Sequence, residues 1–247
     1  MFKVALVGGP AEAYIDLCIN SWLNQKNVDF QIQVILDSIE GDKTAEKALK
    51  YNGIDPRINV KVNDVRQYAI PNFLDAFKMM NPVDEDILVM ADADDWAYSD
   101  YSLAIVKSYY DRQVNLSLTH GSWTSYPNSN ANTNNAAYSE QDFAIGIRHV
   151  PWRGSHLRTF KYKVWKYLKE EDLKDQNGEF FKVSWDLCCI WPLLETLGFH
   201  RIKFIPEILY VYNQETPFND GKLYLQEQMR LTDYIAALPP YPYIENL

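Results

Sequence analysis

The first 119 residues alternate short apolar runs with amphipathic segments, and this alternation restricts the fold more than any other feature. The runs have the length and β-branched content of buried strands and cover residues 4–7, 32–36, 58–62 and 87–90. Between them, apolar residues recur at helical spacing, in segments that include residues 15–23, 44–51 and 72–80. Such alternation is typical of parallel sheets with crossover helices. The sequence therefore predicts an α/β fold with a mostly parallel central sheet flanked by helices.

The second half has a different character, which predicts a C-terminal α+β portion. After an expected strand at 116–119, residues 126–140 are rich in asparagine and lack apolar periodicity, as in a long mobile loop. Helices are expected at about 185–197 and before the PPYPY tail, with two short strands within 202–212. We find no internal repeat and no linker-like segment, so a single domain is expected.

Composition excludes several classes of protein. With 47% hydrophobic residues among 247, the chain can bury a large core. A net charge of -9 and a pI near 5.0 disfavour long-range attraction to nucleic acid. Cys18, Cys188 and Cys189 are odd in number and lie in apolar runs, as buried thiols in a reducing compartment would. No signal peptide or membrane-spanning run of about 20 apolar residues is seen, so we expect a cytoplasmic protein.

The most informative motif is ADADDW, which places Asp92, Asp94 and Asp95 directly after the fourth apolar run. Clustered carboxylates raise one another's pKa values unless a cation neutralises them. Hard oxygen ligands suit Mg²⁺ or Mn²⁺. The alternative is a solvated acidic turn in which Asp94 or Asp95 caps the next helix, but a cap needs one acid and this turn has three. The motif therefore favours a metal site.

Other residues are expected near this motif because they also follow predicted strands. In an open parallel sheet, ligands bind beyond the carboxyl ends of the strands. Gly8 and Gly9 follow the first strand, and Asp37 follows the second. Asp37 has an alternative role in an Asx turn. The sequence thus predicts one crevice that holds the glycines, Asp37 and the acids of residues 92–95.

With these residues in place, the chain resembles the GT-A glycosyltransferases. ADADDW after an apolar strand is similar to their DxD motif, and the chain order resembles their large inverting family two. KVALVGGPAEAYIDLCINSWLNQ is similar to that family's first strand and helix, although Gly8-Gly9-Pro10 replaces the usual Pro-Thr-Tyr-Asn. VILDSIEGDKT resembles the second strand and its acidic turn, with Ser38 where a second acid is expected. The resemblance covers about the first hundred residues.

The resemblance implies a GT-A fold and transfer of a sugar from a nucleotide-sugar to a hydroxyl acceptor, with inversion. Residues 1–119 would bind the nucleotide-sugar and residues 120–247 the acceptor. Asp37 would accept from the imide N–H of the base, which fits uracil best. Asp92 would face the ribose or the sugar and contribute to the metal site, while Asp94 would bind Mn²⁺ or Mg²⁺. Asp95 would contact the sugar or orient the metal ligands, and Gly8 and Gly9 would approach the nucleotide.

The segment between Phe143 and Glu170 carries seven lysines and arginines and no acid. A departing nucleoside diphosphate gains negative charge, which a nearby Arg or His can stabilise. Arg158, with His156 close to it, is the best candidate for this role. The alternative is a solvated basic helix face, which residues 161–169 fit better.

The segment FKVSWD leads into the helix expected at 185–197. In the resembling family, an acid at the start of a late helix acts as general base on the acceptor hydroxyl, and Asp186 occupies that place alone where the family often has two acids. Trp185 offers a platform for a sugar ring. The alternative is helix capping by Ser184 or Asp186. In the resembling family a side chain late in the chain often completes the metal or diphosphate site, and the candidates here are Tyr210, Tyr212, Asn213, Asn219 and Asp220.

Two other functions fit parts of the pattern. A sugar nucleotidyltransferase could use Gly8-Gly9 as a phosphate loop, but Pro10, Ala11 and Glu12 follow where a basic side chain is expected. A non-catalytic GT-A-like domain could bind glycans through its aromatic residues, which form 14% of the chain. The acceptor is expected to be a carbohydrate shaped by aromatics of the second half, namely Trp123, Tyr126, Tyr138 and Trp152. The basic segment leaves a phosphorylated or nucleic-acid acceptor open.

Overall fold

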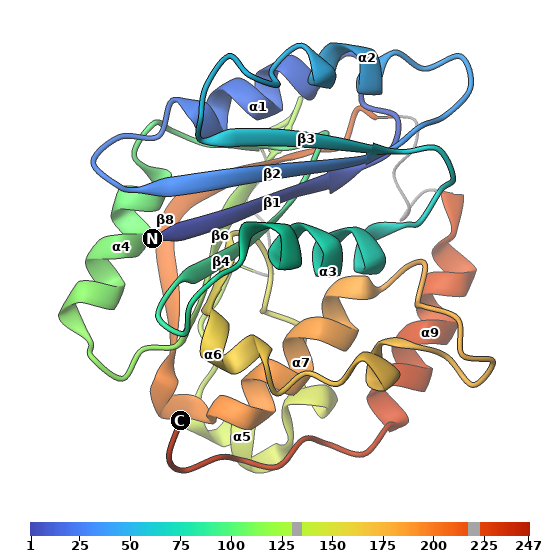
Figure 1. The fold of residues 1–247 in the computed structure, drawn as a ribbon. Coiled ribbons are helices and arrows are strands. Elements are labelled where there is room, and N and C mark those ends of the chain that lie inside the picture. Colours follow the sequence, from blue (N-terminus) through green and yellow to red (C-terminus); the bar gives the residue numbers. More distant parts are fainter. Residues whose placement is uncertain (130–134, 217–222) are drawn as a thin grey trace.

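A computed structural model describes residues 1–129, 135–216 and 223–247, which form one mixed sheet with helices on both faces (Figure 1). The strand order is β3-β2-β1-β4-β7-β6-β8-β5. The first four strands are β1 (Phe2–Gly8), β2 (Phe30–Asp37), β3 (Ile58–Asn63) and β4 (Ile87–Asp92). All pairings among them are parallel. The predicted parallel sheet of the first half is therefore confirmed.

The second half extends this sheet with strands of both directions. These strands are β5 (Trp96–Ala97), β6 (Leu118–Tyr126), β7 (Arg158–Lys161) and β8 (Ile202–Asn213). Strand β7 runs antiparallel to both β4 and β6, while β6 and β8 are parallel. Strand β5 is antiparallel to β8 at the edge of the sheet. The reversal at β7 brings the second half of the chain back against β4, beside the acidic motif.

One prediction in this region is wrong, because the two short strands expected within 202–212 are the single strand β8. Pro206 lies within this strand. The β6–β8 register shifts between Gly121 and Ser122 and again before Trp123, so Pro206 falls in a bulge where no ladder hydrogen bond is required of it. The strand bends at the bulge and continues.

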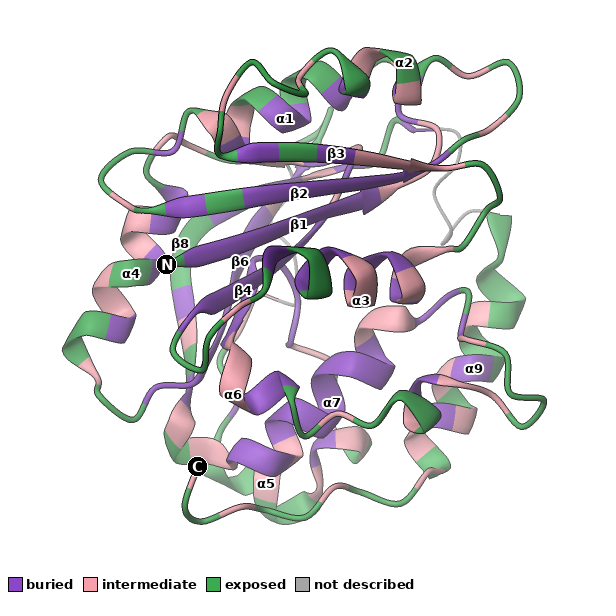
Figure 2. Ribbon diagram, viewed as in Figure 1, coloured by how far each residue is buried: buried purple, intermediate pink, exposed green. Residues whose placement is uncertain are grey.

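Two hydrophobic cores lie on opposite faces of the sheet. One contains residues of α1 (Ile15–Leu23), α2 (Thr44–Leu49) and α4 (Ser102–Arg112). The other contains residues of α3 (Ala69–Met80), α6 (Tyr162–Trp165), α7 (Trp185–Leu197) and α9 (Leu225–Ala237). Helix α7 is buried along nearly its whole length, unlike the outer helices (Figure 2). The sheet and α7 thus form the rigid frame of the molecule.

Several boundaries differ from the predictions for local reasons. Helix α3 begins before Pro71, because proline is tolerated in the first turn of a helix. The basic helix face expected at 161–169 is wrong in extent, since α6 covers only Tyr162–Trp165 and the 3-10 turn Glu170–Leu173 begins after this range. In the loop expected at 126–140, residues 127–129 and 135–139 contain no helix or strand, and α5 (Glu140–Ile145) closes it with a capping box. Residues 130–134 lie outside the described part.

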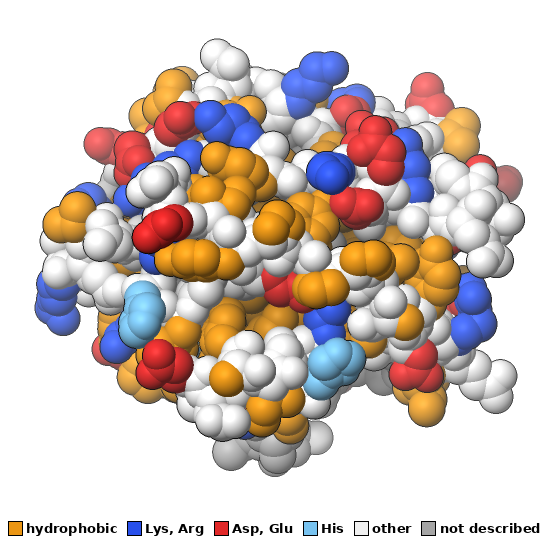
Figure 3. Space-filling view, turned by 90° about the horizontal axis from the view of Figure 1, so that it is seen from below, with side chains coloured by type: hydrophobic (Ala, Val, Ile, Leu, Met, Phe, Trp, Pro, Cys, Tyr) orange, Lys and Arg blue, Asp and Glu red, His pale blue; other side chains and the backbone are white. Residues whose placement is uncertain are grey.

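The C-terminal segment crosses the face below the sheet and is held there by a buried ion pair. Arg148 donates from Nε to Glu195 at 2.6 Å and from Nη1 to the carbonyl of Leu238, while the N–H of Tyr241 donates to Glu195 at 2.9 Å. The view from below shows hydrophobic side chains at the centre of this face (Figure 3).

In the described ranges, no helix combines the length and apolar content that crossing a bilayer requires.

We expect Glu195→Ala to lower the free energy of unfolding by ~3–5 kcal/mol, because it leaves a buried guanidinium without its carboxylate. The Arg148 side chain is 5% exposed. Chemical denaturation measures the change. Asp111→Ala, which removes an exposed pair with Lys107, is the control and should change stability by no more than ~0.5 kcal/mol. Equal effects of the two substitutions would contradict this account of the tail.

His120 predicts a dependence of stability on pH. Burial lowers its pKa from 6.5 to about 4, so the folded state binds this proton less readily than the unfolded state does. Its contribution to stability is therefore complete above pH 6.5 and is lost as the pH falls toward 4, at up to ~1.4 kcal/mol per pH unit. Chemical denaturation between pH 4 and 7 should show that the free energy of unfolding of His120→Phe rises less steeply with pH than that of the wild type. Burial also lowers the pKa of His156, so the stability of the variant still depends on pH in part. An equal pH dependence of the free energy of unfolding in the wild type and in His120→Phe would contradict the prediction.

Candidate active site

The predicted site residues converge on one cavity of about 250 Å³ at the carboxyl ends of β1, β2 and β4. Its lining includes Gly8, Gly9, Asp37, Asp92, Asp94, His156, Arg158 and Asp186. Asp95, the remaining predicted residue, is buried beneath the acidic turn, with 1% of its surface exposed. Residues that lie far apart in the sequence are thus brought together by the reversal at β7.

The acidic turn is held from two sides by backbone contacts. On the side of β1, the N–H of Ala93 donates to the carbonyl of Val7 at 2.8 Å. A Cβ placed on Gly8 would lie 2.8 Å from the Cβ of Ala93, closer than two carbon atoms can approach. Gly8 is therefore required for the turn to pack against β1.

On the other side, the end of β8 binds the turn. The backbone N–H of Asn213 donates to Asp95 Oδ1 at 2.7 Å, and its side-chain amide donates to the carbonyl of Asp94 at 3.0 Å. The N–H of Asp92 donates to the hydroxyl of Tyr210 at 3.0 Å. Tyr210 and Asn213, singled out in the sequence, thus position the acids through hydrogen bonds.

Asp95 sits in an unfavourable electrostatic environment. Burial raises its pKa well above the usual value, and the neighbouring carboxylates of Asp94 and Asp92 raise it further. Its Oδ2 atom has no hydrogen-bond partner in the described structure. A buried carboxylate oxygen without a partner is costly unless a positive charge compensates it. The turn is therefore chemically suited to a divalent cation.

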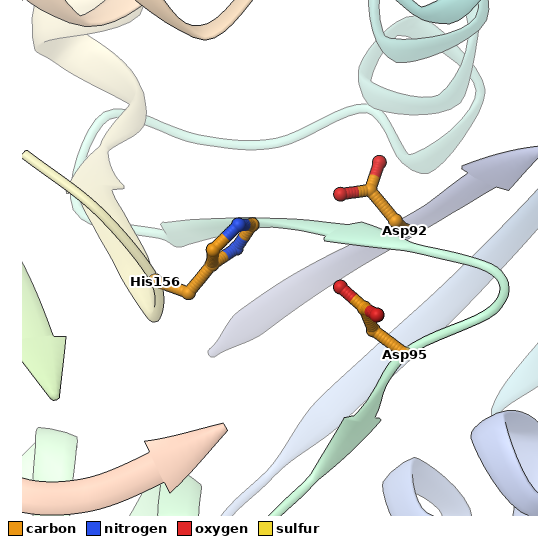
Figure 4. A group of neighbouring side chains, drawn as sticks. All are labelled: Asp92, Asp95 and His156. Carbon is orange, nitrogen blue, oxygen red and sulfur yellow. The ribbon is translucent and has the colours of Figure 1, made fainter. Parts of the chain in front are cut away.

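A three-residue group in the described structure has the composition of a metal site. Asp92, Asp95 and His156 each offer one ligand atom, and these atoms lie within 4.8 Å of one another (Figure 4). Burial, and then the positive charge of Arg158, lower the pKa of His156 well below its usual value. Its Nδ1 atom has no hydrogen-bond partner there. A neutral imidazole is the form that binds metals, and carboxylates are the ligands that Mg²⁺ and Mn²⁺ prefer.

Asp37 organises the loop after β3. Its Oδ1 accepts from the side-chain amides of Asn63 at 3.0 Å and Asn72 at 3.1 Å, and its Oδ2 accepts from the N–H of Tyr68 at 2.9 Å. Tyr68 has a φ of 67° and a ψ of -177°, which is unfavourable for a residue with a side chain. The carboxylate therefore holds Tyr68 in place at the edge of the cavity. The contact of Asp37 with a base stays a prediction.

The candidate base and the candidate diphosphate-binding arginine are in direct contact. Arg158 Nη2 donates to Asp186 Oδ2 at 3.1 Å, and Arg158 Nε donates to the carbonyl of Gly154 at 2.9 Å. Arg158 is 3% exposed, its Nη1 has no partner in the described residues, and its guanidinium lies 5.1 Å from the Trp185 ring centre. Ser184 makes no side-chain cap to α7; its hydroxyl donates to the carbonyl of Gln228 instead. The arginine thus keeps hydrogen-bonding capacity beside the carboxylate.

Sequence reasoning missed several lining residues, among them Arg66, Tyr68, Asn72, Lys182 and Gln228. The Arg66 guanidinium lies 4.4 Å from the Tyr68 ring centre, and Lys182 Nζ lies 5.3 Å from it. Arg66 and Tyr68 follow β3, so the rule that selected Asp37 would have selected this loop as well. Lys182 belongs to the FKVSWD segment that contains Asp186, whereas Gln228 lies near the site only in three dimensions. Asn219 and Asp220 lie outside the described residues.

The basic segment does not form one positive surface. Lys161 and Lys163 pair with Glu85, and Lys166 pairs with Asp84. Arg153 pairs with Asp142. Because these charges are neutralised locally, the segment provides little of the positive field that a nucleic-acid acceptor would need.

The order of strands, the crevice at their carboxyl ends and the acids after β4 define a GT-A glycosyltransferase. Residues 10–169 match the sequence profile of glycosyl transferase family 2. Since this match covers more than half of the chain, the protein belongs to that family. No curated protein sequence matches it.

Solved structures share the fold at low sequence identity. Staphylococcus aureus TarS 1-349 in complex with UDP-GlcNAc is 16% identical, with a TM-score of 0.63, over 96% of this chain and 68% of that one. Glucosyl-3-phosphoglycerate synthase from Mycobacterium tuberculosis, with Mn²⁺, UDP-glucose and phosphoglyceric acid, is 12% identical, with a TM-score of 0.65, over 97% and 80%. The mannosyltransferase PcManGT from Pyrobaculum calidifontis, with GDP-Man and Mn²⁺, is 13% identical, with a TM-score of 0.58, over 93% and 61%. The likeness confirms the predicted fold.

We expect Gly8→Ala to destabilise the protein by ~1–3 kcal/mol, because the added methyl group forces β1 and the acidic turn apart. Gly9→Ala is the matched control. Its Cβ would meet the nearest atom, on Ile39, at an ordinary 3.6 Å, so a change within ~0.5 kcal/mol is expected. Urea denaturation of the two variants provides the comparison, and a Gly8→Ala protein as stable as Gly9→Ala would show that the close approach is not required.

Proposed function

We propose that the protein transfers a sugar from a nucleotide-sugar, with a UDP-sugar favoured, to a hydroxyl group of a glycan, with assistance from a divalent metal. The observation that carries the proposal is the meeting, in one cavity, of an acidic cluster suited to a cation and an arginine–carboxylate pair. The acidic cluster can bind a diphosphate through its metal, and the carboxylate of the arginine–carboxylate pair can take a proton from the acceptor hydroxyl. Family membership and the fold support this assignment.

The metal is assigned to Asp92 and Asp94 from the sequence, and the geometry supports adding Asp95 and His156. Mn²⁺ or Mg²⁺ bound here would neutralise the acids and polarise the diphosphate of the donor. Arg158 lines the cavity and would complete the diphosphate site, because a guanidinium can donate to a phosphate and a carboxylate at once. The glucosyl-3-phosphoglycerate synthase and the mannosyltransferase with similar folds were solved with Mn²⁺ together with their nucleotides.

The nucleotide is assigned to residues 1–119. Gly8 and Gly9 present backbone at the cavity wall, and Asp37 lies beneath the loop that carries Tyr68. An ionised carboxylate has about four acceptor positions, and Asp37 uses three, so one is left for the imide N–H of uracil. TarS and the synthase were solved with uridine nucleotides and the mannosyltransferase with a guanosine one, so a donor panel must include both bases.

The acceptor is assigned to residues 120–247, with Asp186 as the general base. Asp186 would take the proton of the acceptor hydroxyl as the oxygen attacks the anomeric carbon, and direct displacement would invert its configuration. Trp185, at the same helix start, would pack under a sugar ring. Arg158 fixes the position of the Asp186 carboxylate until substrate arrives.

The two other functions considered have less support. A nucleotidyltransferase would need a basic side chain after Gly8-Gly9, but the N–H of Ala11 donates to Thr44 Oγ1 at 2.7 Å and Glu12 accepts from the N–H of Lys43. A purely glycan-binding domain would not need an acidic cluster beside a buried histidine. Membership of glycosyl transferase family 2 favours the transferase over both.

Calorimetric titration with UDP tests the donor site. We expect the wild-type protein to bind UDP at least tenfold more tightly with Mn²⁺ than without it, because the metal bridges the acids and the diphosphate. Asp92→Asn should lose this gain and keep the metal-free affinity. Asp64→Asn, an equal change of charge at an exposed position after β3, should behave like the wild type. A UDP affinity independent of Mn²⁺ in all three proteins would refute the metal site.

The release of nucleoside diphosphate from UDP-glucose, UDP-GlcNAc and GDP-mannose, with glycans or water as acceptor, tests catalysis. For a donor that is turned over, Asp186→Asn should lower kcat by ~10²–10⁴ and leave the donor KM nearly unchanged, because the base acts on the acceptor. Asp233→Asn on the exposed face of α9 is the control. A kcat equal to that of the control would remove Asp186 from its assigned role.

A further inference from the structure

A second cavity, of about 430 Å³, adjoins the candidate active site. Tyr68 and Lys182 line both cavities. The rest of its lining comes from residues 175–183 and from residues 224–231 at the start of α9, which lie side by side (Figure 1). Its volume falls in the range of small-ligand sites. A molecule bound at the reaction centre could therefore extend past Tyr68 and Lys182 into this second space.

Two segments of the chain pass from one cavity to the other. Residues 180–183 line the second cavity, and the next three residues, which end at Asp186, line the active site. In α9, Glu227 lines the second cavity and the adjacent Gln228 lines the active site. The hydroxyl of Ser184 donates to the carbonyl of Gln228 at 3.1 Å, which joins the two segments. The two cavities thus share their walls, and the candidate base lies in the first of them.

The turn that forms one wall of the second cavity is held by its own hydrogen bonds. Asp175 Oδ1 accepts from the N–H of Asn177 at 2.8 Å and from the N–H of Glu179 at 3.1 Å. Lys174 and Phe180 form a β-bridge, and Lys174 Nζ lies 4.6 Å from the centre of the Phe180 ring. The half-buried ring is therefore fixed in the cavity wall. Because the wall is preformed, a ligand would pay little for ordering it.

The second cavity also presents polar groups that are open to solvent. Glu179 and Lys182 are exposed, and neither has an ion-pair partner among the residues that the structure describes. Glu227 and Arg230 pair with each other, with distances of 2.8 and 2.7 Å between their nitrogen and oxygen atoms. The described lining carries three acidic and two basic side chains. This balance disfavours a polyanionic ligand.

Aromatic surface combined with exposed carboxylate and ammonium groups suits a sugar ring. A sugar ring has C–H faces that pack on aromatic side chains, and hydroxyl groups that both donate and accept hydrogen bonds. Phe180 and Tyr224 provide the aromatic surface. Glu179 can accept from a hydroxyl group, and Lys182 can donate to one. The chemistry of the lining thus indicates a neutral carbohydrate.

We propose that this cavity binds the second sugar of a neutral glycan acceptor whose terminal sugar lies at Asp186. The proposal rests on the proposed function, in which Asp186 acts on an acceptor hydroxyl. The second ring would pack against Phe180, and its hydroxyl groups would bond to Glu179 and Lys182. The acceptor would then contain at least two sugars, because a single sugar leaves the second cavity unused. Two linked contacts would favour disaccharides over monosaccharides.

Saturation-transfer NMR with the full chain, without nucleotide, tests the proposal. The ligands are glucose, galactose, mannose and N-acetylglucosamine, their disaccharides, and glucose 6-phosphate. At least one disaccharide should bind at least ~tenfold more tightly than its monosaccharide. Phe180→Ala removes the aromatic surface and Glu179→Ala removes the exposed acceptor, so each should weaken disaccharide binding at least ~threefold and leave monosaccharide binding unchanged. Phe204→Ala, at a half-buried aromatic residue outside both cavities, is the matched control.

UDP binding with Mn²⁺, measured on the same proteins, separates this site from the donor site. All three variants should bind UDP as the wild type does, which also shows that they are folded. If the wild type does not bind UDP but its disaccharide affinity still depends on Phe180 and Glu179, the donor assignment falls and the sugar site stands. If UDP binds but no disaccharide binds more tightly than its monosaccharide, the sugar site alone falls.

Two further results would overturn the proposal. One is an equal loss of disaccharide affinity in Phe204→Ala and Phe180→Ala, which would show that the effect is not local to the second cavity. The other is tighter binding of glucose 6-phosphate than of any disaccharide, which would show that Lys182 selects a phosphate group and that the ligand is not neutral.

Discussion

The burial of Asp95 beside two further carboxylates is the constraint on which the rest of the site depends. Three acids at one strand end repel one another, and Asp95 has almost no water to screen it. Hydrogen bonds from both sides keep the turn in this conformation. The carbonyl of Val7 in β1 accepts from the turn, and the backbone and side-chain amides of Asn213 in β8 donate to it. Such an arrangement stores electrostatic free energy that a divalent cation would release on binding.

The architecture explains how these groups reach one place. Strand β7 is antiparallel to β4 and ends the parallel half of the sheet, so the residues just before it arrive beside the acidic turn. His156 and Arg158 enter the cavity in this way, and Arg158 connects to Asp186 at the start of α7. The same crossing carries Arg153 past Tyr138, and the backbone N–H of Arg153 donates to the Tyr138 hydroxyl at 2.8 Å.

Much of the first half was predictable because local patterns and tertiary structure agree there. Strands β1, β2 and β4 are buried along most of their length, and they read as apolar runs together with the partly exposed edge strand β3. Helix α7 was expected at the residues where it occurs. The errors arose where tertiary contacts outweigh local preference. Pro206 is accommodated by a bulge, and the lysines of residues 161–163 are drawn to Glu85 instead of forming a long solvated helix. Gln228 could not be found, because nothing local marks it as part of the cavity, and Lys182 was overlooked although it lies in the FKVSWD segment.

The sequence by itself determined the strand–helix order, the acidic cluster after β4 and the residue types available for chemistry, since these follow from hydrophobic periodicity and from charges that are adjacent in the chain. Only the tertiary structure decided that His156 lies within reach of Asp92 and Asp95 and that Arg158 pairs with Asp186. Those contacts join residues that are distant in the sequence. They depend on strand order and register, which arise from the packing of the whole sheet and leave no trace in any one segment.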